Sequence, residues 1–212
     1  MGLGMEFQSK LRAARIVPVI VIKELGQAVP LAKALVEGGL PILEITLRTP
    51  VALEAIRAIS HTVKDALVGA GTVTNAQQFA QAAAAGAQFV VSPGLTEEVA
   101  QASHAYQIPI LPGVATASDI MRGMRLGLTL FKFFPAETSG GVPAIKALGG
   151  PFPQINFCPT GGISPANLSS YLSLPNVIAA GGSWMVPTDL NEADAFARAT
   201  LMAREARALA AA

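Results

Sequence analysis

The chain has 212 residues, of which 51% are hydrophobic and only 14% are charged, whereas ordinary soluble domains carry about 25% charged residues. A membrane protein is excluded because a spanning helix needs about 20 consecutive apolar residues, and the longest such run, from Ile16 to Ile22, is far shorter and contains Pro18. The 15 basic and 14 acidic residues form no basic cluster, which excludes sequence-independent nucleic-acid binding. We therefore expect a soluble protein with no nucleic-acid or membrane partner.

The remaining composition indicates a compartment and argues against a metal. Cys158 is the one cysteine and cannot form an internal disulfide, which fits a reducing cytoplasm. The segment from Met1 to Glu6 has neither the signal-peptide nor the myristoylation pattern. Two histidines, His61 and His104, are too few for a histidine-built metal centre. We expect a cytoplasmic protein without metal or cofactor, folded as a single domain over residues 1–212.

Short β-branched or aromatic runs recur along the chain, separated by alanine-rich amphipathic stretches. They predict eight strands: Ile16–Ile22, Ile42–Arg48, Leu67–Thr72, Gln88–Ser92, Ile108–Gly113, Leu128–Phe134, Ile155–Thr160 and Val177–Gly182. Their starts recur about every 20–27 residues, the interval that a strand, a helix and two short loops require.

Helix start and stop signals lie between these runs. Asn75, Thr96 and Thr116 are N-cap residues, and Gly86 is a C-cap residue. We predict helices over Glu6–Arg15, Ala76–Ala85, Glu97–Ala105, Ser118–Arg125 and Glu192–Leu209, and one with Pro165 in its first turn.

Eight strand–helix units in a chain of this length predict an α/β fold, a (β/α)8 TIM barrel with an extra N-terminal helix. The alternative is an open, doubly wound sheet. Such a sheet normally carries a glycine-rich fingerprint after its first strand, and the segment from Lys23 to Gln27 does not have one. A barrel places its chemistry at the C-terminal ends of its strands.

The sixth predicted strand places Lys132 within an apolar, aromatic run. Lysines are almost never buried without a partner, and burial favours the uncharged amine, the form that attacks a carbonyl to give a Schiff base. The alternative is a lysine whose ammonium group extends from the strand end into water.

The second predicted strand alternates polar and apolar side chains. Glu44, Thr46 and Arg48 share one face, which we expect to point into the barrel. Strands two and six lie opposite each other in an eight-stranded ring, so Glu44 faces Lys132 in this arrangement. The alternative is a structural pair between Glu44 and Arg48.

The last two predicted strands both end in paired glycines, Gly161-Gly162 and Gly181-Gly182, the second followed by Ser183. Backbone N–H groups at such turns can approach an anion closely, and barrels often bind phosphate after strands seven and eight. The alternative is a pair of ordinary tight turns. Thr72 and Pro93 lie at the ends of strands three and four and are weaker candidates. Thr72 could donate a hydrogen bond into the site, and Pro93 could form part of its wall.

Together these strand ends resemble the family of 2-keto-3-deoxy-6-phosphogluconate (KDPG) and 4-hydroxy-2-oxoglutarate (KHG) aldolases, over nearly the whole chain. The resemblance is carried by Glu44–Thr49, Gly69–Val73, Ser92–Gly94, Phe131–Ala136, Pro159–Ile163 and Gly181–Trp184.

The resemblance implies a class I aldolase, usually a homotrimer, that cleaves KDPG, a phosphorylated keto acid, to pyruvate and glyceraldehyde 3-phosphate. It assigns Lys132 as the Schiff-base lysine and Glu44 as the general acid/base. It also assigns the substrate contacts: Arg48 and Thr72 for the carboxylate, Gly161, Gly162, Gly182 and Ser183 for the phosphate, and Pro93, Phe134 and Thr160 for the walls.

Three alternatives stay open at this point. The enzyme could also cleave KHG, to pyruvate and glyoxylate, or it could prefer KHG or the galactonate epimer of KDPG, because the pyruvyl half is common to all three substrates. It could be a metal-dependent aldolase, against which the histidine count argues. It could also be a phosphate-binding barrel without catalysis, against which the presence of both Glu44 and Lys132 argues.

Overall fold

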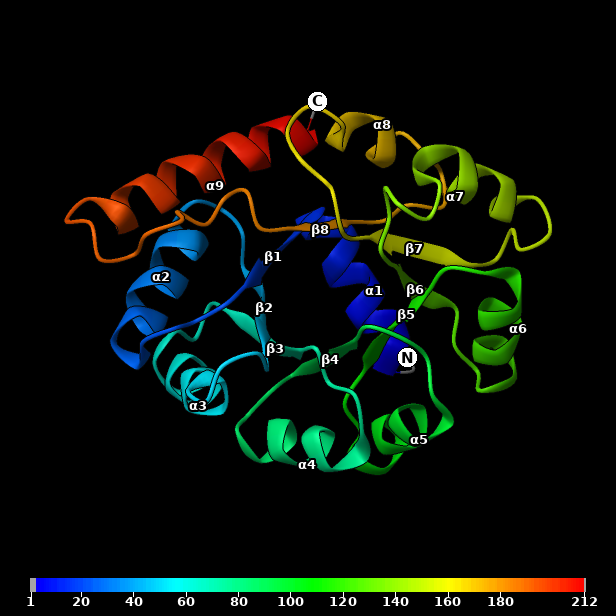
Figure 1. The fold of residues 1–212 in the computed structure, drawn as a ribbon, viewed down its shortest axis with the longest axis horizontal. Coiled ribbons are helices and arrows are strands. Elements are labelled where there is room, and N and C mark those ends of the chain that lie inside the picture. The colour runs from blue at the N-terminus through cyan, green and yellow to red at the C-terminus, as the bar shows by residue number, and fades with distance from the viewer. Residues whose placement is uncertain (1–2, 212) are drawn as a thin grey trace.

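A computed structural model describes residues 3–211; Met1 and Gly2, which begin the segment compared with signal peptides, and Ala212 lie outside the described residues. Eight parallel strands form a nearly closed barrel surrounded by helices, as Figure 1 shows from one end. The predicted (β/α)8 barrel with an N-terminal helix is therefore confirmed. Within residues 3–211, no helix is long and apolar enough to cross a membrane.

Every predicted strand is present, with bounds that differ by a few residues. The strands are β1 (Ile16–Ile20), β2 (Ile42–Thr46), β3 (Leu67–Gly71), β4 (Phe89–Ser92), β5 (Ile110–Val114), β6 (Leu130–Phe133), β7 (Asn156–Pro159) and β8 (Ala180–Gly182). Hydrogen-bonded neighbours run in the order β7-β6-β5-β4-β3-β2-β1-β8. Isolated bridges, Phe157 to Val177 and Thr160 to Gly181, connect the chain around β7 to the chain around β8, so that the ring is nearly closed.

One helix precedes β1 and one follows each described strand. They are α1 (Leu3–Ala14), α2 (Leu25–Glu37), α3 (Ala52–Thr62), α4 (Ala76–Ala84), α5 (Glu97–Tyr106), α6 (Ala117–Arg125), α7 (Gly141–Gly149), α8 (Leu168–Leu172) and α9 (Ala195–Ala211). The side chains of Asn75, Thr96 and Thr116 cap α4, α5 and α6 as predicted.

Two helices begin later than the sequence predicts. The chain around Pro165 forms a turn, and α8 starts at Leu168 because the Asn167 side chain hydrogen-bonds the preceding backbone. The last helix starts at Ala195, not at Glu192, because Glu192 to Asp194 form a turn.

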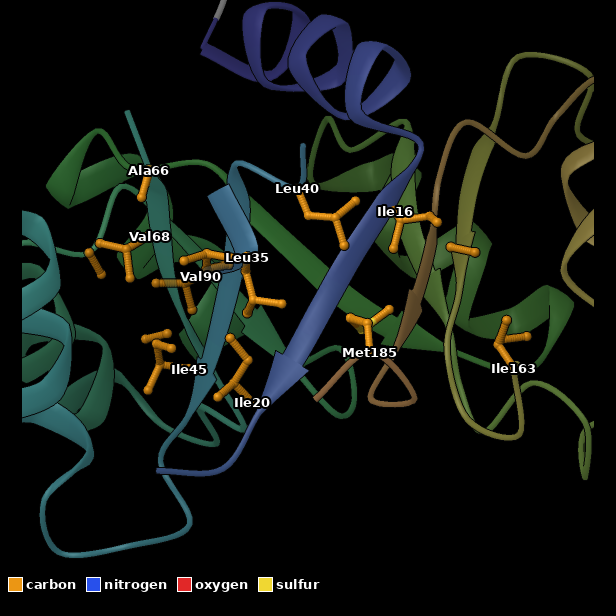
Figure 2. Packing of buried hydrophobic residues seen from close by; sticks show 14 of the residues in the cluster. Ile16, Ile20, Leu35, Leu40, Ile45, Ala66, Val68, Val90, Ile163 and Met185 are labelled. Carbon is orange, nitrogen blue, oxygen red and sulfur yellow. The ribbon is translucent and has the colours of Figure 1, made fainter. Parts of the chain in front are cut away.

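Alternating strand residues divide the core into two layers. Leu43 and Ile45 of β2 face the helices, in a large outer cluster that also holds Ile20, Val68 and Val90 (Figure 2). Residues of the opposite parity face the barrel interior, where they form a second cluster: Val17, Ile42, Phe89, Val91, Leu111, Leu130 and Cys158. Side chains in a strand alternate between faces, so this division places Glu44 and Lys132 inside the barrel.

Helix α1 packs against the N-terminal end of the barrel interior. Phe7, Leu11 and Ala14 belong to the inner cluster, and the Phe7 ring stacks on Phe89 with 5.0 Å between ring centroids. Figure 1 shows α1 in dark blue across the centre of the ring. The opposite end, where the strands terminate, carries the candidate site residues.

Candidate active site

Lys132 of β6 and Glu44 of β2 meet inside the barrel. Lys132 Nζ lies 3.5 Å from Glu44 Oε1, and the two residues are only 5% and 2% exposed. The predicted opposition of these residues across the ring is confirmed. The alternative of a lysine reaching into water is wrong, and within residues 3–211 Glu44 forms its ion pair with Lys132 rather than with Arg48.

Glycines on the neighbouring strands create the space for this pair. A Cβ atom on Gly71 of β3 would overlap the Glu44 carboxylate. On the other side of the barrel, Gly113 of β5 is in register with Lys132, and a Cβ there would overlap the Pro93 carbonyl. Glycine is therefore required at both positions for the backbone and side chains to approach this closely.

The surroundings of Lys132 are apolar and aromatic. Its Nζ lies 4.9 Å from the centroid of the Phe134 ring, a distance at which a ring attracts a cation. Cys158 of β7 is the register partner of Lys132 and is buried. Burial raises the pKa of the Cys158 thiol to about 12, although the positive charge of Lys132 acts in the opposite direction.

Arg48 and Thr72 form a second polar group at the ends of β2 and β3. Arg48 Nε donates a hydrogen bond to Thr72 Oγ1 at 3.1 Å. Thr72 has a φ angle of +61°, which is strained for a β-branched residue and is characteristic of functional sites. Gly71 precedes Thr72 and contacts Glu44, so the Arg48–Thr72 pair adjoins the Lys132–Glu44 pair.

The two glycine turns lie side by side because Thr160 pairs with Gly181. Gly161 and Gly162 have φ angles of +99° and +81°, the left-handed region that glycine enters without steric cost. At the neighbouring turn, the Trp184 ring occupies the position of a Gly182 side chain. Ser183 is exposed between Gly182 and Trp184.

The three predicted wall residues border these features. A Cβ atom on Gly113 would meet the Pro93 carbonyl, one on Gly161 would meet the Phe134 ring, and one on Gly181 would meet the Thr160 hydroxyl. Glu44 and Lys132 lie within their strands, and the other predicted site residues lie at the C-terminal end of a strand or in the segment that follows it.

Sequence reasoning missed three residues that support the first glycine turn. Asn167 bonds its backbone, Glu137 packs on Gly162, and Tyr171 donates a hydrogen bond to the Glu137 carboxylate. The asparagine at the start of a helix directly after this turn was the one available signal.

The fold and the buried pair define a class of protein, namely a (β/α)8 barrel enzyme with an amine beside a carboxylate at the catalytic end of the barrel. Comparisons with known proteins are more specific. The sequence pattern of the family described as KDPG and KHG aldolase matches residues 7–202. A 2-dehydro-3-deoxy-phosphogluconate aldolase of Pseudoalteromonas atlantica is 58% identical over 196 residues, which cover 92% of this chain and 91% of that protein.

Two crystal structures are similar over nearly their whole length. The KDPG aldolase of Zymomonas mobilis ZM4, solved with 3-phosphoglycerate, is 48% identical with a TM-score of 0.92 and 97% of each chain covered. The KDPG aldolase of Legionella pneumophila holds pyruvate as a covalent carbinolamine; it is 47% identical with a TM-score of 0.90, covering 93% of this chain and 96% of that one. The chain belongs to the KDPG and KHG aldolase family. It is an aldolase, a lyase that cleaves a carbon–carbon bond.

We predict that Cys158 is inert to thiol reagents in the native protein at pH 8. A thiol with a pKa of about 12 carries very little thiolate at this pH, and the residue is 1% exposed. A disulfide reagent should titrate one thiol per chain in denaturant and essentially none in buffer. Rapid reaction of one thiol per chain in the folded protein would contradict this prediction, because it would show that the reagent reaches Cys158 inside the barrel.

Proposed function

We propose that this aldolase cleaves KDPG to pyruvate and glyceraldehyde 3-phosphate through a Schiff base on Lys132. The observation that carries the proposal is the burial of Lys132 against Glu44, because the other lysines, Lys10, Lys23, Lys33, Lys64 and Lys146, are all exposed. The carbinolamine trapped in the Legionella relative supports the same covalent route.

The first half of the reaction forms the Schiff base. Lys132 first gives a proton to Glu44, and the resulting uncharged amine attacks the C2 ketone. Glu44 then returns the proton to the developing carbinolamine and assists its loss of water to give an iminium ion. Glu44 suits this role because its carboxylate oxygen is within 3.5 Å of the reacting nitrogen. The iminium then serves as the electron sink for bond cleavage.

The second half breaks the C3–C4 bond. The C4 hydroxyl loses its proton to Glu44 through a water molecule, glyceraldehyde 3-phosphate leaves, and the bond electrons form an enamine on the pyruvyl half. Protonation of the enamine at C3 regenerates an iminium ion. Its hydrolysis consumes one water molecule, releases pyruvate and restores the Lys132 amine.

Two flanking groups orient the substrate in this proposal. Arg48 and Thr72, already hydrogen-bonded to each other, hold the pyruvyl carboxylate, for which the planar guanidinium offers two parallel contacts. The turns at Gly161, Gly162 and Gly182 with Ser183 hold the phosphate. The phosphate ester seen in the Zymomonas relative supports a phosphorylated ligand in this fold.

We further propose that residues 1–212 act as one catalytic domain, as a homotrimer in the cytoplasm. The support for association between chains is the set of large apolar side chains that remain exposed on the described chain: Met5, Val21, Leu25, Tyr106, Met121, Met124, Leu201 and Leu209. An oligomer interface can cover such residues. Sedimentation equilibrium should give three times the mass of one chain, and a monomer would contradict this assignment.

We predict that borohydride reduction in the presence of pyruvate attaches a three-carbon adduct to Lys132 alone. Peptide mass analysis locates the adduct, with exposed Lys23 and Lys146 as internal controls. Lys132→Ala should remain folded without adduct or turnover, and Glu44→Gln should keep part of the adduct with little turnover. An adduct elsewhere would refute the site, and the absence of any adduct would favour a barrel without this chemistry.

We also predict a higher kcat/KM for KDPG than for KHG or the galactonate epimer, because the two glycine turns add contacts to a terminal phosphate. Steady-state kinetics with all three substrates measures this directly. The pyruvyl contacts are common to all three, so activity on KHG should be measurable. A preference for KHG would make the unphosphorylated keto acid the physiological class of substrate.

A further inference from the structure

The first glycine turn is fixed from the side opposite its amide groups. The Thr160 carbonyl accepts a hydrogen bond from the Ala136 N–H at 2.8 Å, and the Gly161 carbonyl accepts one from the Glu137 N–H at 3.1 Å. Both donors lie directly after β6, in the segment that follows Lys132. The turn is thereby attached to the strand that carries the proposed nucleophile.

Asn167 fixes the third carbonyl of the turn. Its Nδ2 donates to the Gly162 carbonyl at 2.9 Å, and its Oδ1 accepts from the Ser164 N–H, also at 2.9 Å. One side chain therefore spans the backbone from Gly162 to Ser164. Because these contacts use a donor and an acceptor on two separate atoms, neither alanine nor an ionised aspartate reproduces both.

The orientation of the amide groups follows from these bonds. In a planar trans peptide the C=O and N–H bonds point in opposite directions. Holding the carbonyls of Thr160, Gly161 and Gly162 therefore directs the N–H groups of Gly161, Gly162 and Ile163 away from β6 and α8. The parallel bridge between Thr160 and Gly181 directs the Gly161 N–H to the Gly181 carbonyl of β8, whereas within residues 3–211 the N–H groups of Gly162 and Ile163 have no hydrogen-bond acceptor. Two successive unpaired amides of this kind are suited to an anion.

Glu137 and Tyr171 complete the support. The Glu137 side-chain stem lies on Gly162 in the space of a missing Cβ, whereas its carboxylate is directed to Tyr171 and Gly141. Tyr171 is fully buried and donates its hydroxyl hydrogen to that carboxylate. Burial, reinforced by the Glu137 hydrogen bond and charge, raises the pKa of Tyr171 above its usual value, so the hydroxyl stays a donor at neutral pH.

We propose that Asn167, and Tyr171 acting through Glu137, are positioning residues that hold the Gly161–Gly162 turn in its phosphate-binding conformation. By this means they determine the preference for phosphorylated over unphosphorylated keto acids. This inference rests on the proposed function, which assigns the phosphate to the same turn. It concerns residues that do not contact the reacting carbon atoms.

Asn167 and the Tyr171–Glu137 pair support the turn through different interactions. Asn167 keeps the turn rigid, so the amide groups need no reordering when the anion arrives. Tyr171 keeps a carboxylate directed away from the turn, and a released Glu137 carboxylate beside a phosphate dianion would repel it. Loss of either support therefore weakens phosphate binding, but only the second loss is relieved by neutralising Glu137.

The test compares KDPG with KHG, which lacks the phosphate, in the full-length enzyme. Asn167→Ala and Tyr171→Phe should each raise KM for KDPG and lower kcat/KM about tenfold, the size expected for one or two lost hydrogen bonds. Values for KHG should stay within about twofold of wild type, because its carboxylates do not reach the turn. Ser169→Ala is the matched control, because Ser169 is an exposed residue of α8, the helix that carries Tyr171. It should leave KM and kcat/KM unchanged for both substrates.

A rescue experiment separates positioning from general damage. The double variant Tyr171→Phe with Glu137→Gln keeps the tyrosine substitution and removes the negative charge. Its KM for KDPG should therefore fall most of the way back to the wild-type value. Circular dichroism and the KHG activity report that each variant is folded.

The outcomes are distinguishable. Equal kcat/KM for the two substrates in wild type would reject the phosphate role that the proposed function assigns to the turn, and the inference with it, but not the Schiff-base chemistry of Lys132. A wild-type preference for KDPG that the variants retain, or a parallel loss on both substrates, would overturn only the inference. A double variant as impaired as Tyr171→Phe alone would overturn the role assigned to the Glu137 charge.

Discussion

The placement of two charged groups in the interior of a parallel barrel is the constraint on which the rest of this structure depends. Removing an isolated charge from water costs several kcal/mol, and a buried pair regains this only in favourable geometry. At 3.5 Å with almost complete burial, the Lys132–Glu44 pair contributes little net stability. Its retention is explained by chemistry, because a carbonyl nucleophile and its proton carrier need to lie within one hydrogen bond of each other.

The backbone around the pair is adapted to it. Gly71 leaves room for the Glu44 carboxylate, and Gly113 lets β5 approach the β4 loop. The strained φ angle of Thr72 follows directly after Gly71 and presents its hydroxyl to Arg48. The barrel is stabilised by separate apolar layers inside and outside the strands, so the end that carries the chemistry can hold glycine, strain and charge without losing the fold.

Sequence reasoning predicted what depends on local periodicity. The alternation along β2 correctly placed Glu44 inside the barrel, and the parity of strands two and six placed it opposite Lys132. The helix after Ser164 was placed too early, because the side chain of Asn167 stabilises a turn there that helix signals do not reveal. The Tyr171–Glu137 contact was missed for a similar reason. A contact between a helix residue and a loop residue 34 positions apart depends on how the strands are ordered in space, which no local pattern specifies.

The central claim is that Lys132 and Glu44 depend on each other energetically and are retained for chemistry rather than for stability. A double-mutant cycle of unfolding free energies tests it most directly. Urea denaturation would be measured for the wild type, Lys132→Met, Glu44→Met and the double variant. We expect each single variant to be about 3–5 kcal/mol less stable, because one charge is left buried alone. We expect the double variant to be inactive but close to the wild type in stability, or above it. Single-variant losses that simply add in the double variant would contradict the account, because independent residues behave in that way.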